Sequence, residues 1–227
     1  MTLVIFHPIQ WICFNVFGYQ AHKKSVDIFQ FFLMRCANIL GTRFTFINPH
    51  HIETNQPLII VANHQSMYDI SPIMWYMRKH HPKFISKMEL GKGIPSVSYN
   101  LRHGGSVLID RKNPRQSLPA IMKFGDYIES TKRAAVIFPE GTRSENGVPK
   151  EFQTKGLEIL IKKIPSALIV PISINNSWKT VRYGNFPLGL GSHINFTVHE
   201  PIKLSTFVNK ETLISTIEAT IKNHIHP

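Results

Sequence analysis

The sequence predicts an α/β domain whose largely parallel sheet is flanked by helices, preceded by an N-terminal two-helix membrane-binding segment. Short unbroken apolar runs, typical of strands buried on both faces, alternate with helix-like stretches and predict the domain. The predicted boundaries are 1–40 for the membrane-anchoring helices and 41–227 for the α/β domain. With 43% hydrophobic and 18% charged residues among 227, the chain has enough apolar side chains for a buried core.

The charge balance indicates an anionic partner. Lys and Arg number 26 against 14 Asp and Glu, which gives a formal net charge of +12. Nucleic acid, an anionic lipid surface or a phosphorylated substrate would each satisfy this excess. Cys13 and Cys36 both lie in apolar stretches, which excludes a disulfide framework and favours a reducing compartment. The sequence contains no zinc-finger spacing, no Walker A motif and no GxGxxG.

The first apolar run, residues 3–17, is marginal as a membrane span. A spanning helix needs about 20 predominantly apolar residues, and this run contains a proline and three polar residues. No basic residue precedes the run and no small-residue cleavage site follows it, which disfavours a signal peptide. Lys23 and Lys24 come next and would hold this end at the anionic cytoplasmic surface.

The second apolar run, residues 26–40, has the pattern of a helix lying in a membrane interface. At helical spacing, Asp27, Gln30, Arg35 and Asn38 fall in one wedge of about 140°. The remaining helix surface is apolar, as in interfacial helices. We therefore expect a monotopic anchor of two helices. The alternatives are a single N-terminal span, or packing of both helices on the domain core.

The remaining elements follow in order along the chain. Strands are expected at 43–47, 57–62, 84–86, 106–109, 134–138, 167–170 and 194–198. Helices are expected at about 70–78, 115–131, 154–163 and 210–223. Ligands of parallel α/β folds bind beyond the carboxyl ends of strands, so polar residues at these positions are the candidate site residues.

His64 and Asp69 follow the apolar run 57–62. On one regular helix a separation of five residues would place them on different faces. They can meet if His64 lies in the strand-to-helix turn and Asp69 near the start of the next helix. An aspartate that accepts from one imidazole nitrogen leaves the other nitrogen free as a general base. The alternative is a structural histidine and a capping aspartate.

A second polar cluster follows the apolar run 134–138. Gly141 allows backbone amides to approach a ligand, Thr142 and Ser144 offer hydroxyls, and Arg143 can hold a phosphate through paired hydrogen bonds. A tight turn with a solvated charge is the alternative. Asp110 with Arg111, and Lys87, follow two further predicted strands. Four successive strands thus end in groups suited to one anionic ligand.

These motifs resemble those of the glycerolipid acyltransferases, above all the 1-acyl-glycerol-3-phosphate acyltransferases of the bacterial PlsC type. His64 and Asp69 fit the family's His-x4-Asp motif, and residues 138–144 (FPEGTRS) match its third motif throughout. Residues 105–111 are similar to the second motif, although Leu stands where an aromatic is frequent, and 170–174 resemble the apolar fourth. The motifs occur in family order over roughly half the chain.

The resemblance implies transfer of an acyl group from acyl-CoA or acyl-acyl carrier protein to the sn-2 hydroxyl of lysophosphatidate at the cytoplasmic face of a membrane. His64 would be the general base and Asp69 would orient it, with no metal or cofactor. Either backbone amides or Lys87 could donate hydrogen bonds to the developing oxyanion, and the sequence does not choose between them. The substrate-binding residues implied are Lys87, Arg111, Glu140, Gly141, Thr142 and Arg143.

Other functions remain open at this point. The acceptor could be another lysolipid, such as lyso-ornithine lipid or a lysophospholipid, or glycerol 3-phosphate. A metal-dependent hydrolase is disfavoured, because the pairs His50-His51 and His80-His81 would point to opposite sides of an extended chain and no HExxH occurs. Dispersed cations disfavour nucleic-acid binding. A non-catalytic basic membrane-binding protein is the remaining alternative.

Overall fold

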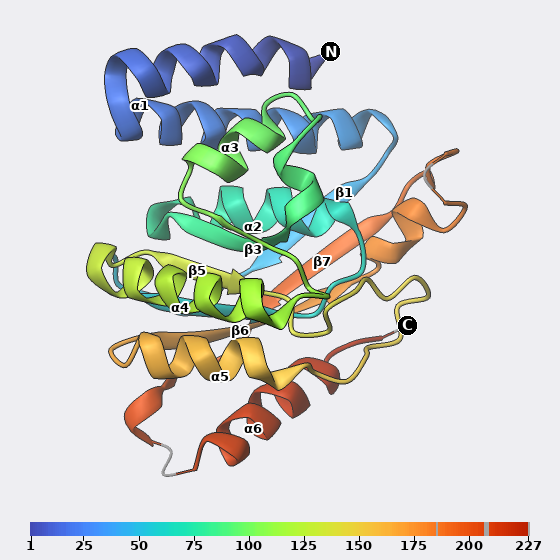
Figure 1. Cartoon of the computed structure of the whole chain (residues 1–227). Helices are drawn as coiled ribbons and strands as arrows, with labels where there is room; N and C mark the ends of the chain where they lie inside the picture. Colours follow the sequence, from blue (N-terminus) through green and yellow to red (C-terminus); the bar gives the residue numbers. More distant parts are fainter. Residues whose placement is uncertain (185, 207–208, 227) are drawn as a thin grey trace.

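The computed structural model describes residues 1–184, 186–206 and 209–226, which form one sheet with helices on both sides (Figure 1). The helices are α1 (Thr2–Ile39), α2 (Ile70–Tyr76), α3 (Val97–His103), α4 (Pro114–Thr131), α5 (Thr154–Lys163) and α6 (Lys210–Lys222). The strands are β1 (Arg43–Ile47), β2 (Leu58–Ala62), β3 (Pro82–Lys87), β4 (Val107–Ile109), β5 (Ala134–Ile137), β6 (Leu168–Asn175), β7 (His193–Val198) and β8 (Ile202–Lys203).

The sheet is largely parallel, as predicted. Its strand order is β1-β7-β6-β2-β5-β3-β4, with β8 paired to β6. β2 runs parallel to both of its neighbours, β5 and β6, while β7 and β8 pair with β6 antiparallel. The carboxyl ends of β2, β5, β3 and β4 therefore lie at one edge, next to each other, and the loops that follow these four strands meet there.

Successive side chains of β2 point to opposite faces of the sheet and belong to two separate layers of the core. Ile59 and Val61 pack with α4, α5 and α6 on one face of the sheet. Leu58, Ile60 and Ala62 pack with α2 on the other face. All five residues are fully buried, which explains why the strand reads as an unbroken apolar run rather than an alternating one.

The N-terminal segment folds into a hairpin of two helices, as the two apolar runs predicted. Gly18 has a φ of 77° and a ψ of −168°, which breaks α1 and turns the chain back on itself (Figure 1). A glycine adopts this conformation without the steric penalty that a side chain would bring. The hairpin packs on α2 and α3. Among the described residues, no helix combines the length and the apolarity needed to cross a membrane.

Two members of the polar wedge predicted for the second apolar run, Asp27 and Gln30, do not face outward as in an interfacial helix. The Gln30 side chain is buried, and Asp27 forms an ion pair with Lys23 in which its own side chain is only 14% exposed. Both face the domain rather than water. Val26, Phe29 and other apolar residues of the same helix pack on the domain with them, so the alternative of helix packing on the core is correct for this helix.

Candidate active site

His64 and Asp69 meet in the turn after β2, in the arrangement that the sequence required. The chain leaves the sheet at Asn63, and Asp69 ends a short 3-10 helix, Met67–Asp69. The His64 Nδ1 atom lies 2.8 Å from Asp69 Oδ2, and Asp69 is fully buried. Since a carboxylate only accepts, this contact assigns the proton of a neutral imidazole to Nδ1, which leaves the Nε2 lone pair for a substrate proton.

The same Asp69 oxygen also fixes the turn itself. It accepts hydrogen bonds from the backbone N–H of Gln65 at 2.7 Å and of Ser66 at 2.9 Å. The Ser66 hydroxyl in turn accepts from the backbone N–H of Tyr68 at 3.0 Å, which completes a capping box. Asp69 therefore positions both the imidazole and the backbone that carries it.

Asn63 ties this turn to β6, a contact that the local sequence pattern did not reveal. Its side-chain amide donates to the Ile174 carbonyl at 2.8 Å and accepts from the Ile174 N–H at 2.7 Å. The Phe138 ring stacks on the His64 ring, with centroids 4.2 Å apart and planes inclined by 15°. The imidazole is thus held by a carboxylate at one edge and by an aromatic ring on one face.

The loop after β5 holds the backbone of His64 on both sides. Glu140 Oε1 accepts the His64 N–H at 2.8 Å, and the Ser144 N–H donates to the His64 carbonyl at 2.8 Å. Glu140 Oε2 accepts the Lys150 N–H at 2.9 Å. Burial raises the pKa of Glu140, while these two amide donors lower it. Glu140 therefore meets backbone amides with both of its oxygens.

Cations gather where the loops after β4 and β5 meet. The Arg111 guanidinium donates to the Gly141 carbonyl. Desolvation and the neighbouring charge of Arg143 lower the pKa of Arg111, and Glu89 raises it. Gly141 has a φ of 71°, in the left-handed region that favours glycine. Arg111, Thr142 and Arg143 are all exposed to solvent, so their polar groups are accessible to a ligand.

Lys150 belongs to this cluster, although the sequence did not single it out. Its ammonium group donates to Thr142 Oγ1 at 2.9 Å and to the Arg143 carbonyl at 2.7 Å. These bonds cross-link the loop that carries the predicted phosphate-binding residues. The only sequence signal was another basic residue shortly after the FPEGTRS motif, and its contact could not be derived from that spacing.

Lys87 ends β3, where it pairs in register with Ile109 of β4. The strand β5 separates β3 from β2 and its His64 loop. Within the described residues, the exposed Lys87 side chain makes no hydrogen bond to His64, Arg111 or Arg143. The structure therefore places Lys87 at the same sheet edge as the other candidates without a direct link to them.

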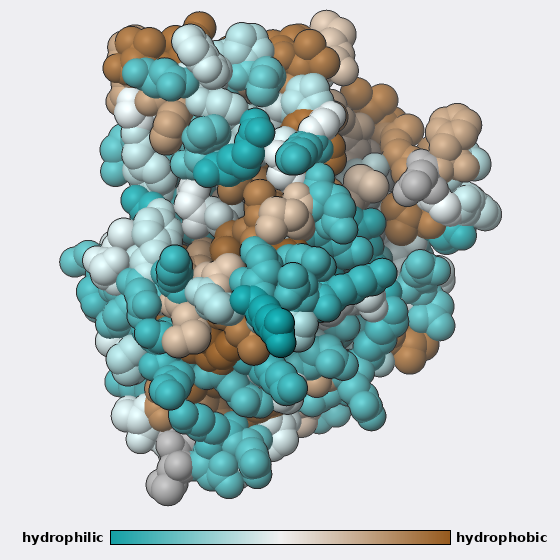
Figure 2. All heavy atoms as spheres, viewed as in Figure 1, coloured by the Kyte–Doolittle hydropathy of each residue, from teal (hydrophilic) through white to brown (hydrophobic). Residues whose placement is uncertain are grey.

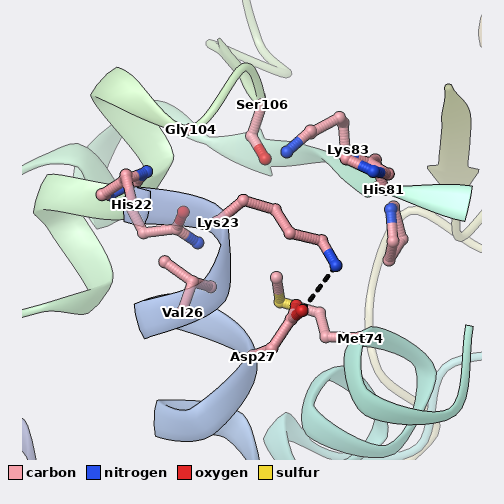
Figure 3. Close-up of a pocket in the computed structure, with 11 residues that line it drawn as sticks. His22, Lys23, Val26, Asp27, Met74, His81, Lys83, Gly104 and Ser106 are labelled. Carbon is pink, nitrogen blue, oxygen red and sulfur yellow. Dashed lines mark hydrogen bonds and ion pairs between the residues drawn. The ribbon is translucent and has the colours of Figure 1, made fainter. Parts of the chain in front are cut away.

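A different polar pocket lies beneath the N-terminal hairpin, where the parallel strands begin (Figure 3). Lys83, near the start of β3, is 6% exposed, and burial together with the charge of Arg133 lowers its pKa to about 7. Burial likewise lowers the pKa values of His22 and His81 to about 4. The pocket is at the opposite edge of the sheet from His64, and no predicted site residue lines it.

Comparison with known proteins agrees with the motifs and with the fold. The Acyltransferase family model matches residues 43–175, more than half of the chain. The 1-acyl-sn-glycerol-3-phosphate acyltransferase of Helicobacter pylori is 35% identical over 127 residues, which cover 52% of this chain and 51% of that protein. The sheep 1-acyl-sn-glycerol-3-phosphate acyltransferase alpha is 25% identical over 154 residues, covering 67% and 52% respectively.

A solved structure shares the fold. The 1-acyl-sn-glycerophosphate acyltransferase PlsC of Thermotoga maritima superposes with a TM-score of 0.79 at 24% identity, covering 97% of this chain and 87% of that one. The chain spans about half the length of the curated relatives described above. The family match, the motifs in their order and the common fold agree: the chain belongs to the Acyltransferase family, and among its members it resembles the PlsC type.

Proposed function

We propose that the protein transfers a fatty acyl group from a thioester to the free sn-2 hydroxyl of lysophosphatidate, giving phosphatidate. The observation that carries this proposal is the buried His64–Asp69 pair, at the same sheet edge as the Arg111 and Arg143 loops. Acylation of an alcohol that bears a phosphate needs a base beside a cationic loop. The Helicobacter pylori and sheep relatives are both 1-acyl-sn-glycerol-3-phosphate acyltransferases, which supports the same acceptor.

In the proposed step, His64 Nε2 removes the hydroxyl proton while the hydroxyl oxygen attacks the thioester carbonyl carbon. The carbon–sulfur bond then breaks, the thiolate takes the proton back from His64, and an ester and a free thiol are released. Asp69 stabilises the imidazolium that exists between the two proton transfers. Acyl-CoA and acyl-acyl carrier protein are both suitable donors, and the step uses no metal and no cofactor.

Direct attack by the acceptor is favoured because the serine hydroxyls beside His64 are engaged in structural bonds. The Ser66 hydroxyl lies 2.5 Å from the Ser177 hydroxyl, and the Ser144 hydroxyl donates to the Val148 carbonyl at 2.6 Å. Both serines are buried, and both cysteines lie on α1. No covalent acyl-enzyme is therefore part of the proposed mechanism.

Arg111 and Arg143 are the proposed ligands of the acceptor phosphate. Arginine suits this role because its planar fork can donate two parallel hydrogen bonds to phosphate oxygens. Lys150 orders the loop through Thr142, and Gly141 gives it the turn that brings it to Arg111. Glu140 is assigned to the substrate site as a positioning residue, because its oxygens hold backbone amides.

Lys87 is proposed to assist the phosphate ligands rather than the oxyanion. It ends the strand that pairs with β4, which leads into Arg111, and β5 separates it from the His64 strand. Backbone amides near His64 are then the proposed donors to the developing oxyanion.

The N-terminal hairpin, residues 1–40, is proposed to bind an anionic membrane surface at its cytoplasmic face, while residues 41–227 carry the chemistry. The first helix of the hairpin exposes an almost continuous apolar face at helical spacing. It consists of Val4, Ile5, Ile9, Trp11, Ile12 and Val16, each at least 40% exposed. Apolar surface of this extent, followed by Lys23 and Lys24, fits a monotopic anchor.

Acceptor competition tests the proposal. Purified protein in detergent micelles should convert lysophosphatidate to phosphatidate with acyl-CoA or acyl-acyl carrier protein. Lysophosphatidylcholine and lyso-ornithine lipid should react at least about tenfold more slowly, because they lack a phosphate monoester for the two arginines. Faster turnover of either lysolipid would move the proposal to that acceptor, and no turnover with any acceptor would overturn it.

A further inference from the structure

The segment after the short helix Ser177–Val181 carries apolar side chains that the domain does not cover. Tyr183 is 58% exposed, Phe186 88% and Leu190 72%. We call these three residues the apolar tip. Single exposed apolar residues are common on proteins, but three within eight positions of one projecting segment form a patch that favours an apolar partner.

One end of this segment is fixed beside the proposed base. The Ser177 N–H donates to Gln65 Oε1 at 2.9 Å, and the Ser177 hydroxyl lies 2.5 Å from the Ser66 hydroxyl. Gln65 and Ser66 directly follow His64 in the chain. The Ser177–Val181 helix is therefore tied to the turn that carries His64, and the apolar tip follows this helix in the chain.

The other end is fixed to the end of the N-terminal hairpin. The Gly191 N–H donates to the Leu40 carbonyl at 3.0 Å, and the Gly189 N–H donates to the Thr180 carbonyl at 2.9 Å, which closes the base of the segment. In Figure 1 the segment projects at the upper right, beside the end of α1. The apolar tip thus stands on a fixed base between the hairpin and the His64 loop.

The surroundings of the tip match a lipid surface. Ile39, next to Leu40 at the end of α1, is 84% exposed. Figure 2 shows hydrophobic surface on the helices at the top and on the lobe at the upper right. The Arg182 guanidinium lies 4.6 Å from the centre of the Tyr183 ring. Aromatic rings beside basic side chains are typical of the membrane–water interface, where the cation reaches anionic headgroups.

We propose that the apolar tip is a second membrane contact, which inserts into the interfacial region of an anionic bilayer next to the proposed active site. This inference rests on the proposed function, in which the acceptor is a bilayer lipid. The hairpin and the tip hold the molecule at two points, and that sets its tilt on the membrane. The Ser177 contacts then keep the His64 loop close to the lipid surface.

An environment-sensitive label at position 186 tests the contact directly. The two cysteines are first replaced (C13A and C36A), Phe186→Cys is introduced, and an NBD fluorophore is attached. Addition of phosphatidylcholine–phosphatidylglycerol vesicles should shift the emission to the blue, and lipids with a spin label near the headgroup should quench it. The matched control is Met122→Cys on α4, which is exposed at 42% in the full chain and should respond to neither.

Vesicle binding of the unlabelled chain provides a second measurement. The double variant Phe186→Gln/Leu190→Gln should bind the same vesicles about tenfold more weakly, since both apolar side chains lose their burial in lipid. Met122→Gln should bind as the natural protein does. Turnover of a short-chain, monomeric lysophosphatidate should be unchanged in the double variant, because its effect is on membrane contact alone.

Each other outcome overturns the inference. The tip stays in water if the label at position 186 gives no shift while the protein binds vesicles, or if no binding occurs. An emission shift that grows with protein concentration without vesicles would assign the tip to a second copy of the chain. Failure of the proposed function is separate, since it would appear as a lack of acyl transfer to the monomeric acceptor while the label still responds to vesicles.

Discussion

The Glu140 carboxylate accepts the backbone N–H of His64 at 2.8 Å, so the loop after β5 holds the residue that follows β2. Its second oxygen accepts the Lys150 N–H at 2.9 Å. One buried carboxylate therefore joins the proposed base to the loop that carries the proposed phosphate ligands. This relationship explains how an acidic residue can belong to a site for an anionic substrate without facing the anion.

Replacement of Glu140 by Gln should lower kcat more than it changes KM. The new amide NH2 group would face a backbone N–H, and a buried unpaired donor costs about 1–3 kcal/mol. If this cost displaces His64 from its reactive position, kcat should fall by about ten- to hundredfold. Steady-state kinetics with lysophosphatidate measures both constants. Glu145→Gln, an exposed carboxylate later in the same loop, is the matched control. A raised KM with normal kcat would instead place Glu140 against the acceptor.

Replacement of Asp69 by Asn should lower kcat by about 10³-fold or more. An asparagine oxygen in the place of Oδ2 can still accept from the Gln65 and Ser66 amides and from His64, but it carries no charge to stabilise an imidazolium. Single-turnover rates would measure the effect, and a thermal melt would verify folding. Activity within tenfold of the natural protein would show that the carboxylate charge plays no part in the reaction.

Replacement of Arg143 by Ala should raise the KM for lysophosphatidate about ten- to hundredfold, because one charge-assisted pair with phosphate is lost. Arg102→Ala on α3, also exposed, should leave the KM unchanged. A monoacylglycerol acceptor separates the possible causes, since it has no phosphate and should react equally with both variants. Equal losses on the two acceptors would argue against a phosphate ligand.

Replacement of Lys83 by Met should stabilise the protein at neutral pH. The pKa of Lys83 is lowered from 10.5 to about 7, so between these values the unfolded chain holds a proton that the folded chain has released. The free energy of unfolding therefore rises with pH in this window. Lys83→Met should raise Tm at pH 7 and flatten its rise toward alkaline pH. Lys79→Met, an exposed neighbour, should do neither; a lower Tm for Lys83→Met would show that the ammonium stabilises the fold.

The sequence was sufficient for the parts of the molecule that local pattern determines. Unbroken apolar runs located the buried strands, since a strand covered on both faces has no polar face to show. The five-residue spacing of His64 and Asp69 indicated a turn rather than a helix, and the hydrogen bond between them is present. The placement of polar residues after successive strands predicted that the candidate site residues lie at one edge of the sheet, and the strand order brings the ends of these strands together.

Contacts between distant segments could not be read in the same way. Several hydrogen bonds of the site depend on which loops the order of strands in the sheet brings together. They are the bonds between Asn63 and Ile174, between Ser66 and Ser177, and between Lys150 and Thr142. The orientation of the second helix of the hairpin was predicted wrongly for a related reason. Helical periodicity grouped Asp27 with other polar residues, but the packing of this helix on α2 and α3 turns Asp27 toward the domain.

The most direct test of the account is the rate of phosphatidate formation by His64→Ala in detergent micelles, with lysophosphatidate and a labelled thioester donor. The variant should still fold, because Asp69 Oδ2 keeps its hydrogen bonds from the Gln65 and Ser66 amides, and a thermal melt verifies this. We expect its turnover to fall by about 10³-fold or more, with no acyl-enzyme trapped on the protein. Full turnover by the folded variant would contradict the assignment of His64 as the general base and, with it, the proposed mechanism.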